Sequence, residues 1–423
     1  MKRGILRADT GSPRRPTSRR VSWADIAPAE PRPWGDMPDN ALLRISAFLR
    51  CRADRVHMAS VNRQWHAAVR GPRPPLLPPR PPLPRQLPWL IFPNTQVPVF
   101  YSPLTERYHQ LCNVPADVRR ARLCGSGAAG WVVLALDSRN AYALYNLNSG
   151  RRIALPPAFN TPSDTEFPLV VRAATFSAAP SPNNPYMVAA IVLVATRDTA
   201  AFWSEGSDTW FTSGRFLTVR PEDVLYYAGA FYFVTAREGV VSFRPAYGAN
   251  GNVNFQRVDY RMLPRADYGQ DIVFMSGMGT MRHYLVESRG RLLMVVRYIY
   301  KDDGTEALRV FRFRVMEPVI NGQAPPRATW EILDNDLDGR MLFLGPGCSR
   351  SFEVAQYDGF QYQDSMIFFV DESFASVRLK NGRRLYSFTD MGRYDMLEMT
   401  KQTWPGGRRP ARSDNAPPTW WFQ

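Results

Sequence analysis

Four histidines and four cysteines are the side chains of this sequence best suited to bind a metal ion or to act as nucleophiles. The histidines are His57, His66, His109 and His283, and the cysteines are Cys51, Cys112, Cys124 and Cys348. No histidine has metal-ligand spacing to another histidine or to a cysteine. The cysteines show no paired spacing that would indicate a disulfide framework or a zinc module. We therefore expect a reducing compartment and no bound metal.

Two acidic loops resemble calcium sites, and one glycine-rich turn resembles a phosphate cradle. The loops are Asp302-Asp303-Gly304 and the run DNDLDG at 334–339, but a calcium loop needs a glutamate soon after its glycine, and the nearest one, Glu353, lies 14 residues beyond Gly339. We interpret both loops as solvated hairpin turns and GPGCSR at 345–350 as a bent connection between strands. The sequence has no G-x-S-x-G, P-loop or dinucleotide-binding motif. It therefore predicts a non-catalytic protein without a cofactor.

Residues 1–35 form an arm with 8 basic and 3 acidic side chains, and their composition predicts disorder. RRPTSRR at 14–20 is compatible with a weak nuclear address or a phosphate-contacting tail, but we interpret it as a solvated arm. The net charge of +15 is spread along the chain, and no RNA-recognition or zinc-finger signature accompanies it. We expect no nucleic-acid partner.

RVSW at 20–23 has a second interpretation, because it resembles the docking motif by which regulatory subunits bind type-1 protein phosphatase. That resemblance implies that Val21 and Trp23 would fill two apolar pockets from an extended strand. The alternative is that Trp23 packs on the nearby helices.

Residues 37–69 are the clearest helical stretch. Pro38 fits the first turn of a helix, and Asp39 is favoured there by the helix dipole. Asp54 and Ser60 are candidate N-caps of a second and a third short helix. The first helix carries one apolar stripe, made by Ala41, Leu42, Ile45, Phe48 and Leu49. A unit of about 35 residues is too small to bury all its apolar faces alone, so part of this stripe should pack on something else.

This stretch resembles an F-box. The matching positions are Pro38, Leu42, Ile45, Leu49, Val61 and Trp65. The resemblance implies that these residues bind the Skp-type adaptor of cullin–RING ubiquitin ligases. Met37 and Asn62 depart from the usual pattern, and Asn62 would weaken adaptor binding if its amide were buried without a partner, at a cost of roughly 1–3 kcal/mol.

A proline-rich linker follows, with 11 prolines among residues 71–98. Such a stretch is incompatible with a regular helix or a central strand. PPLLPPRPPLPR at 74–85 predicts polyproline II, either as a semi-rigid spacer or as a ligand for aromatic-lined grooves. QLPWLIFP at 86–93 ends the linker with an apolar anchor.

From residue 99 onward, short apolar runs alternate with turn residues and predict β-strands. AGWVVLAL (129–136) and AYALYNL (141–147) indicate a hairpin, and Ala228-Gly229 and Arg289-Gly290 indicate two more turns between strands. The run MVAAIVLVA at 187–195 is the longest apolar segment, too short to span a bilayer, and predicts a buried strand. A weak repeat of roughly 40–60 residues favours the blades of a β-propeller over a double-sheet sandwich, but its irregularity leaves the number of blades open.

The body resembles the domain of unknown function number 295, a kelch-like β-propeller found behind plant F-boxes. The matching segments are 81–93, 121–134, 146–157, 222–235, 283–295, 340–354 and PPTWWF at 417–422. The resemblance implies a mostly β protein with a small N-terminal α unit. The expected parts are a disordered basic arm (1–35), the F-box (36–70), the proline-rich linker (71–92) and the propeller (93–423).

Together these features predict the substrate-recognition subunit of an SCF-type ubiquitin ligase, in the nucleus, the cytoplasm or both. Its partners would be the Skp-type adaptor and a target protein, and it would have no membrane partner. Two alternatives stay open at this point: a non-ligase interaction scaffold with a degenerate F-box, and a regulatory subunit of type-1 phosphatase.

Overall fold

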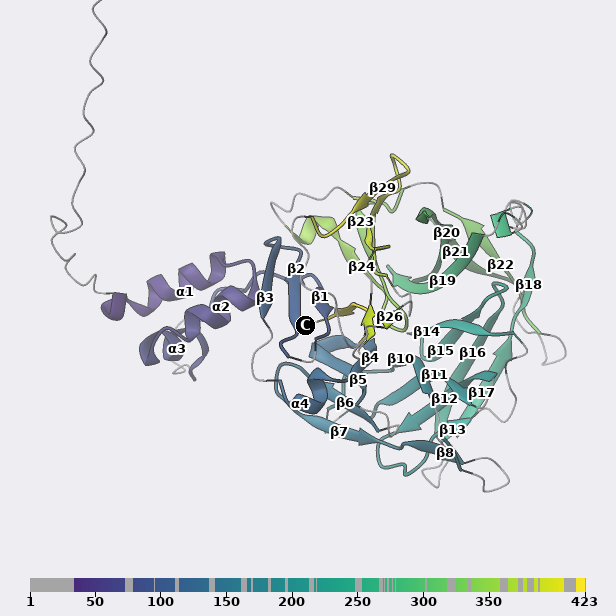
Figure 1. The fold of residues 1–423 in the computed structure, drawn as a ribbon, viewed down its shortest axis with the longest axis horizontal. Helices are drawn as coiled ribbons and strands as arrows, with labels where there is room; N and C mark the ends of the chain where they lie inside the picture. Colours follow the sequence, from purple (N-terminus) through teal and green to yellow (C-terminus); the bar gives the residue numbers. More distant parts are fainter. Residues whose placement is uncertain are drawn as a thin grey trace, which may run out of the picture. The chain divides into compact units, whose positions relative to one another are not determined.

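A computed structural model shows three short α-helices followed by a ring of β-sheets (Figure 1). It describes residues 34–72, 79–94, 96–110, 114–136, 141–160, 166–168, 170–181, 184–194, 197–212, 217, 219–247, 253–265, 269, 271, 274–275, 277, 279–300, 303–317, 325–333, 336–357, 364–371, 376–378, 384–386, 389–406 and 416–422. The chain divides into two compact units, one containing residues 1–47 and 56–81, the other residues 48–55 and 82–423. Among the described residues, we find no helix with the length and apolar character needed to cross a membrane.

The helical segment, residues 34–72, contains a 3-10 turn and three α-helices. These are η2 (Trp34–Asp36), α1 (Asp39–Phe48), α2 (Arg52–Ala59) and α3 (Arg63–Arg70). Helix α1 starts directly after Pro38, whose carbonyl accepts the N–H groups of Ala41 and Leu42. Leu42, Leu43 and Ser46 form its buried face. Of the predicted apolar stripe only Leu42 is buried, whereas Ile45 and Phe48 are exposed.

Both predicted N-caps in this segment are wrong. Helix α2 begins at Arg52, so Asp54 lies within its first turn instead of preceding it. Asn62 caps α3, because its side-chain oxygen accepts the N–H of Trp65 at 2.8 Å, whereas the Ser60 hydroxyl donates to the carbonyl of His57. Asn is as good an N-cap as Ser, and the helix therefore starts two residues later than predicted.

The second unit is a six-bladed β-propeller, built by the described strands of residues 89–421. In order from the rim to the centre, the blades contain the following strands. Blade 1 contains β3 (Arg107–Gln110), β2 (Val99–Ser102), β1 (Trp89–Phe92) and β30 (Thr419–Trp421). Blade 2 contains β7 (Arg152–Leu155), β6 (Tyr142–Asn146), β5 (Trp131–Ala135) and β4 (Arg122–Ser126). Blade 3 contains β13 (Phe211–Thr212), β12 (Arg197–Ser204), β11 (Met187–Val194) and β10 (Val170–Phe176).

The other three blades continue the same order. Blade 4 contains β17 (Val253–Asp259), β16 (Val240–Tyr247), β15 (Ala230–Thr235) and β14 (Pro221–Tyr227). Blade 5 contains β18 (Arg261–Leu263), β22 (Arg327–Ile332), β21 (Gly304–Glu317), β20 (Arg291–Tyr300) and β19 (Gly279–Ser288). Blade 6 contains β29 (Thr400–Thr403), β28 (Gly392–Asp395), β25 (Met366–Phe369), β23 (Arg340–Leu344) and β24 (Arg350–Glu353).

Short elements connect the blades or extend from them. They are α4 (Ala116–Arg119), the 3-10 turns η3 (Ala128–Gly130) and η4 (Val354–Gln356), and the two-stranded ribbons of β8 (Ala158–Asn160) with β9 (Glu166–Pro168) and of β26 (Ser376–Arg378) with β27 (Arg384–Tyr386). Two parallel pairings, β18 with β22 and β23 with β25, give blades 5 and 6 a fifth strand. The sequence repeat did not predict these pairings.

The innermost strands β4, β10, β14, β19 and β24 surround the propeller axis (Figure 1). The sixth, β30, closes the ring by pairing with β1 of the first blade. Next to it, Trp420 packs edge-to-face on Phe343 of blade 6 at 4.9 Å between ring centroids and donates its indole N–H to the carbonyl of Leu344. The last blade is thereby joined to the first through an inner strand from the far end of the sequence.

Apolar residues fill the spaces between neighbouring blades. The described residues form six buried clusters, one for each pair of adjacent blades, including the pair formed by blades 6 and 1. Strand β11 has seven buried residues among its eight, as its apolar run predicts. Such two-sided burial is expected of strands covered by a blade on each face.

The predicted hairpin turns are confirmed. Strands β5 and β6 pair antiparallel, as do β14 with β15 around Ala228-Gly229 and β19 with β20 around Arg289-Gly290. The four residues of the last two turns have φ between 47° and 80°. This is the conformation that a two-residue hairpin turn needs and that a glycine in second position favours.

The predicted linker boundary at residue 92 is wrong, as is the exclusion of a central strand from 71–98. Trp89–Phe92 is strand β1, all four of its residues are buried, and it lies between β2 and β30. It forms because these four residues stand between Pro88 and Pro93, so none of them lacks the N–H that the ladder needs. Residues 79–88 contain neither helix nor strand, while 73–78 of the predicted polyproline segment lie outside the described residues.

Candidate interaction site at the propeller axis

One end of the propeller axis carries a cavity that we name the arginine mouth, defined by Arg122, Arg172, Arg220 and Arg282. Its volume is about 150 Å³. The four arginines come from blades 2, 3, 4 and 5, and each lies at or near the start of an innermost strand. Blade 6 contributes Pro346, and the segment leading into β30 contributes Pro417, Pro418 and Thr419. All six blades therefore line this mouth.

Two buried carboxylates hold three of these guanidinium groups. Asp198 lies 2.7 Å from Nε of Arg172 and 3.6 Å from Nε of Arg220, and Glu222 lies 3.6 Å from Nη1 of Arg282. Both carboxylate side chains are 7% exposed, whereas the three arginine side chains are 43–49% exposed. Arg122 donates to the carbonyl of Val171. Arg172, Arg220 and Arg282 are thus paired with buried carboxylates, while a large part of each arginine side chain stays exposed to solvent.

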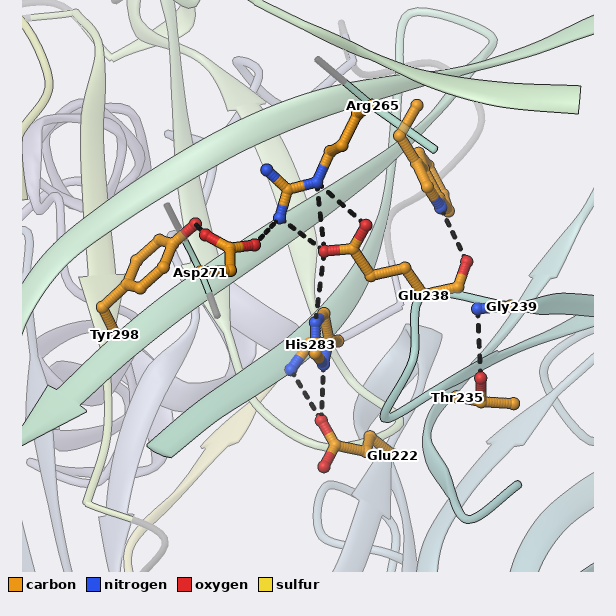
Figure 2. Close-up of polar contacts among 9 residues, drawn as sticks. Glu222, Thr235, Glu238, Gly239, Arg265, Asp271, His283 and Tyr298 are labelled. Atoms are coloured by element: carbon orange, nitrogen blue, oxygen red, sulfur yellow. Dashed lines mark hydrogen bonds and ion pairs between the residues drawn. The ribbon is translucent and has the colours of Figure 1, made fainter. Parts of the chain in front are cut away.

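Behind the mouth, His283 bridges two buried glutamates (Figure 2). Glu222 accepts the backbone N–H of His283 at 3.1 Å and lies 2.7 Å from its Nδ1, and Glu238 lies 3.7 Å from its Nε2. Burial alone would lower the pKa of His283, but the hydrogen bonds and charges of Glu222 and Glu238 outweigh it and raise the pKa to about 9. His283 is therefore a cation at neutral pH.

The same contacts act on the two glutamates. Burial alone would raise the pKa of Glu222 and of Glu238, but the hydrogen bonds from His283 and the nearby arginine charges outweigh it and lower both. Arg265 binds Glu238 through Nε at 2.9 Å and Nη2 at 2.5 Å, and it also binds Asp271. Tyr298 donates to the other oxygen of Asp271 at 2.7 Å. The charges are paired with one another, and this network joins blades 4 and 5.

A turn from blade 6 closes the axis below the mouth. The N–H of Gly347 donates to Asp223 of blade 4 at 2.6 Å, and the N–H of Leu285 in blade 5 donates to the other oxygen of that carboxylate at 2.7 Å. A Cβ at Gly347, which has φ +65°, would lie 2.4 Å from the carbonyl oxygen of Ala174 in blade 3. The turn at 345–349 is thus the bent connection that the sequence predicted, and it fills the centre of the ring.

A second cavity of about 420 Å³ lies on the other side of this turn. Its lining includes Thr175, Ser177, Tyr226, Glu287 and Arg350. Burial lowers the pKa of Arg350, whose guanidinium lies 4.4 Å from the ring centroid of Phe422. Pro346 lines the arginine mouth and Gly347 lines this cavity, so the two ends of the axis are separate sites.

The predicted adaptor-binding residues differ widely in exposure. Leu42 is completely buried, whereas Ile45 is 39% and Val61 57% exposed. Pro38 is exposed and Leu49 is half-buried. Trp65 is half-buried and donates its indole N–H to the carbonyl of Trp34 at 3.0 Å. Ile45 and Val61 are therefore the large aliphatic side chains of this motif that are exposed.

Of the other residues considered for chemistry, Cys51 and His109 lie together. Cys51, Cys124 and Cys348 are buried, and the described residues form no disulfide with them. Cys112 lies outside the described residues, as do Val21 and Trp23 of the predicted phosphatase-docking motif. His66 is exposed, and His109 lies with its Nε2 3.6 Å from the thiol of Cys51.

The acidic loops are partly described. Asp336 accepts the N–H of Asp338 and the hydroxyl of Ser365, and Asp338 and Gly339 have φ of 54° and 76°. This is the geometry of a turn, as predicted. Asp302 and Asp334 lie outside the described residues.

Reasoning from the sequence missed both the arginine mouth and the His283 network. The signal for the mouth was one arginine near the start of each of four successive repeats. It becomes visible only when the repeats are aligned by their inner strands. For the network, no local pattern exists, because its members come from β14, from the turn before β16, from the segment after β18, from β19 and from β20.

The comparison with family models agrees with the propeller architecture. The family model described as KIB1-4 beta-propeller matches residues 100–404. No curated protein matches the chain. Among solved structures, the chain is similar to the N-terminal domain of Nup159 (11% identity over 77% of this chain and 75% of that one, TM-score 0.31). It is also similar to a chain of a nidogen/laminin complex (9% identity over 75% of this chain and 92% of that one, TM-score 0.32). A third similar structure is the computationally designed Ika8 protein (9% identity over 72% of this chain and 97% of that one, TM-score 0.26).

Proposed function

The chain belongs to the KIB1-4 β-propeller family, and from this premise we propose that it is the substrate-recognition subunit of an SCF-type ubiquitin ligase. The propeller family and its fold support a role in protein interaction. In the finer proposal, the helical segment is an F-box that binds a Skp-type adaptor, and the propeller binds a target protein. The proposed setting is the nucleus or cytoplasm of a plant cell.

The observation that carries the proposal is the exposure of Ile45 and Val61 at two positions of the F-box motif. A large aliphatic side chain gains about 1.5–3 kcal/mol on passing from full exposure to full burial, and the exposed parts of Ile45 and Val61 leave a share of that gain to a partner. Leu42 is already buried, so its proposed role is to hold α1 in place instead of contacting the adaptor. The structure thus narrows the proposed contact residues to the exposed members of the motif.

Asn62 no longer argues against adaptor binding. Its side chain is the N-cap of α3 and accepts the N–H of Trp65. The Asn62 amide therefore has a hydrogen-bond partner and does not carry the cost of an unpaired buried group. The alternative of a scaffold with a degenerate F-box loses the stronger of its two supports. Met37, the other, is a mild change from Leu in volume.

We propose that the chain makes and breaks no covalent bond itself. Its contribution to ubiquitin transfer would be positioning, because a target held by the propeller has a high effective concentration near the ligase's conjugating enzyme. The proline-rich segment before β1 would act as a spacer between the adaptor-binding and target-binding parts.

A capture experiment with a purified Skp-type adaptor tests this proposal. The test variant is Ile45→Asp with Val61→Asp, which places two charges at exposed positions and leaves the buried Leu42 unchanged. The control is Ile332→Asp, since Ile332 is 55% exposed on β22 of the propeller. We expect capture by the wild type and the control and at least about a hundredfold weaker capture by the double variant, because buried unpaired charges are costly at an interface.

Two outcomes would count against the proposal. Equal capture of the double variant and the wild type would reject the assigned contact residues. No capture of the wild type at micromolar adaptor would favour the scaffold alternative. Co-purification of type-1 phosphatase that is lost in Val21→Ala with Trp23→Ala would instead favour the phosphatase-subunit alternative.

A further inference from the structure

The arginine mouth has a charge surplus that its own carboxylates do not balance. Four guanidinium groups surround it, while Asp198 and Glu222 are the carboxylates that the described structure pairs with them. Glu222 is also paired with the cationic His283, and Asp198 is shared between Arg172 and Arg220. Among the described residues, Arg122 is bonded to a carbonyl and to no carboxylate. The charged residues of the described lining are four arginines and one glutamate, so this lining carries a net positive charge.

We propose that this mouth binds an acidic segment of the target protein, with one carboxylate side chain inserted among the arginines. This inference rests on the proposed role of the propeller as the target-binding part. Arginine is suited to the task because its planar guanidinium binds carboxylates through two parallel hydrogen bonds. Arg172, Arg220 and Arg282 are held by buried carboxylates, so they lose little side-chain freedom when the segment binds.

The dimensions of the mouth fit a side chain instead of a whole folded element. A volume of about 150 Å³ is several times what a single water molecule needs. This is enough for one carboxylate side chain with some hydration, and the rest of the segment would lie across the opening. The arginines occupy four adjacent blades, and the last two positions of the ring carry Pro346, Pro417 and Pro418. An apolar arc of prolines beside the charged arc fits the aliphatic part of a peptide.

The composition of the mouth favours a protein over a nucleic acid. Proteins that bind single-stranded nucleic acid combine positive charge with aromatic side chains on which the bases stack. The described residues that line the mouth include no aromatic side chain. A stack of bases would have no platform here, whereas a carboxylate needs only the guanidinium groups.

The test measures binding of labelled peptides to the full chain by fluorescence anisotropy. The probe is a hexaglutamate peptide with an uncharged dye, and a hexaglutamine peptide and a hexathymidylate oligonucleotide carry the same dye. The test variant is Arg122→Gln with Arg282→Gln, which leaves the Asp198 pairs intact. The matched control is Arg152→Gln with Arg314→Gln, which removes the same charge from two arginines outside the mouth, on β7 and β21, whose side chains are 45% and 57% exposed.

We expect hexaglutamate to bind and hexaglutamine not to bind. The test variant should bind hexaglutamate at least about tenfold more weakly than the control variant, and binding should weaken as salt is added, since exposed charges are screened. Circular dichroism verifies that both variants fold. If the double variant melts much earlier than wild type, the single Arg282→Gln variant replaces it, because Glu222 keeps its bond to His283 there.

Three outcomes would overturn the inference. Equal weakening in the test and control variants would mean that net charge alone attracts the peptide. Binding of hexathymidylate without binding of hexaglutamate would assign the mouth to nucleic acid. Failure of hexaglutamate to bind at all would leave the mouth without its proposed ligand. Adaptor capture, measured on the same preparation, distinguishes these failures from failure of the ligase proposal, because it depends on Ile45 and Val61.

Discussion

The His283 network makes the stability of the propeller depend on pH in a direction that the structure determines. His283 lies between Glu222 and Glu238 (Figure 2), and its pKa rises to about 9 from an ordinary value of 6.5. The folded protein therefore holds this proton more tightly than the unfolded chain does. The resulting stabilisation is complete below pH 6.5 and is lost as the pH rises through 9.

The magnitude follows from these two values. Proton linkage gives a contribution of about 2.5 kcal/mol at pH 7 and of about 0.5 kcal/mol at pH 9. The free energy of unfolding should thus fall by about 2 kcal/mol between these pH values because of this one group. Burial of the side chain is nearly complete, so solvent screening reduces this figure little. Glu222 and Glu238, whose pKa values are lowered, stay ionised over this range and add nothing to the change.

The assay is urea unfolding followed by tryptophan fluorescence at several pH values from 6 to 9.5, for wild type and His283→Gln. The variant should be less stable at pH 7 by about 3–5 kcal/mol, the usual cost of breaking a buried ion pair. Its stability should also change less between pH 7 and pH 9. Cys124, the pKa of whose thiol is raised by burial, destabilises both proteins at alkaline pH, so the difference between their pH profiles isolates His283. Parallel profiles for the two proteins would refute the assignment of a proton to His283.

Three further predictions concern the helical segment and the ring. Asn62→Ala should lower the free energy of unfolding of the helical segment by about 1 kcal/mol through loss of the N-cap while Asn62→Asp keeps it, as measured by circular dichroism; equal loss in both would show that the cap is not used. Gly347→Ala should destabilise the propeller by more than about 2 kcal/mol, because the new Cβ would meet the carbonyl of Ala174. Gly290→Ala, also at positive φ but with nothing within 4 Å of the new Cβ, should cost about 1 kcal/mol. Similar costs of the two variants in urea unfolding would contradict the role of the turn at 345–349. Trp420→Ala should destabilise the propeller by about 3–5 kcal/mol, and an unchanged unfolding midpoint would exclude this side chain from ring closure.

Much of the fold could be predicted from the sequence because its signals are local. Ala228-Gly229 and Arg289-Gly290 dictate their hairpins through two residues each, and the apolar run that became β11 predicts a strand buried on both faces. Apolar spacing predicted three helices in the segment at 34–72, but it predicted neither their N-caps nor the face of α1 that is buried. Ser60 and Asn62 are both good caps, and only the packing of the segment selects between them.

The site depends on contacts between blades, which leave weak traces in the sequence. Arg122 and Arg282 are 160 residues apart, and the closed ring alone brings them to the same mouth. Glu238, Arg265 and His283 also come together only in the folded ring, because Glu238 belongs to blade 4 and the other two belong to blade 5 or its connections. The prolines of 71–98 led to a wrong prediction, namely that this stretch contains no central strand. Proline is excluded from a central strand at its own position, but the four residues between Pro88 and Pro93 all have the N–H that a strand needs.

Closure of the ring by β30 also sets an order of events during synthesis of the chain. Strand β1, which is apolar and fully buried, is made long before its inner partner at 419–421. At synthesis rates of roughly 5–20 residues per second, the delay is on the order of tens of seconds. Throughout that time the inner edge of β1 presents unpaired N–H and C=O groups, which other chains can pair with. We therefore expect the propeller to be most prone to aggregation during synthesis, before β30 pairs with the inner edge of β1.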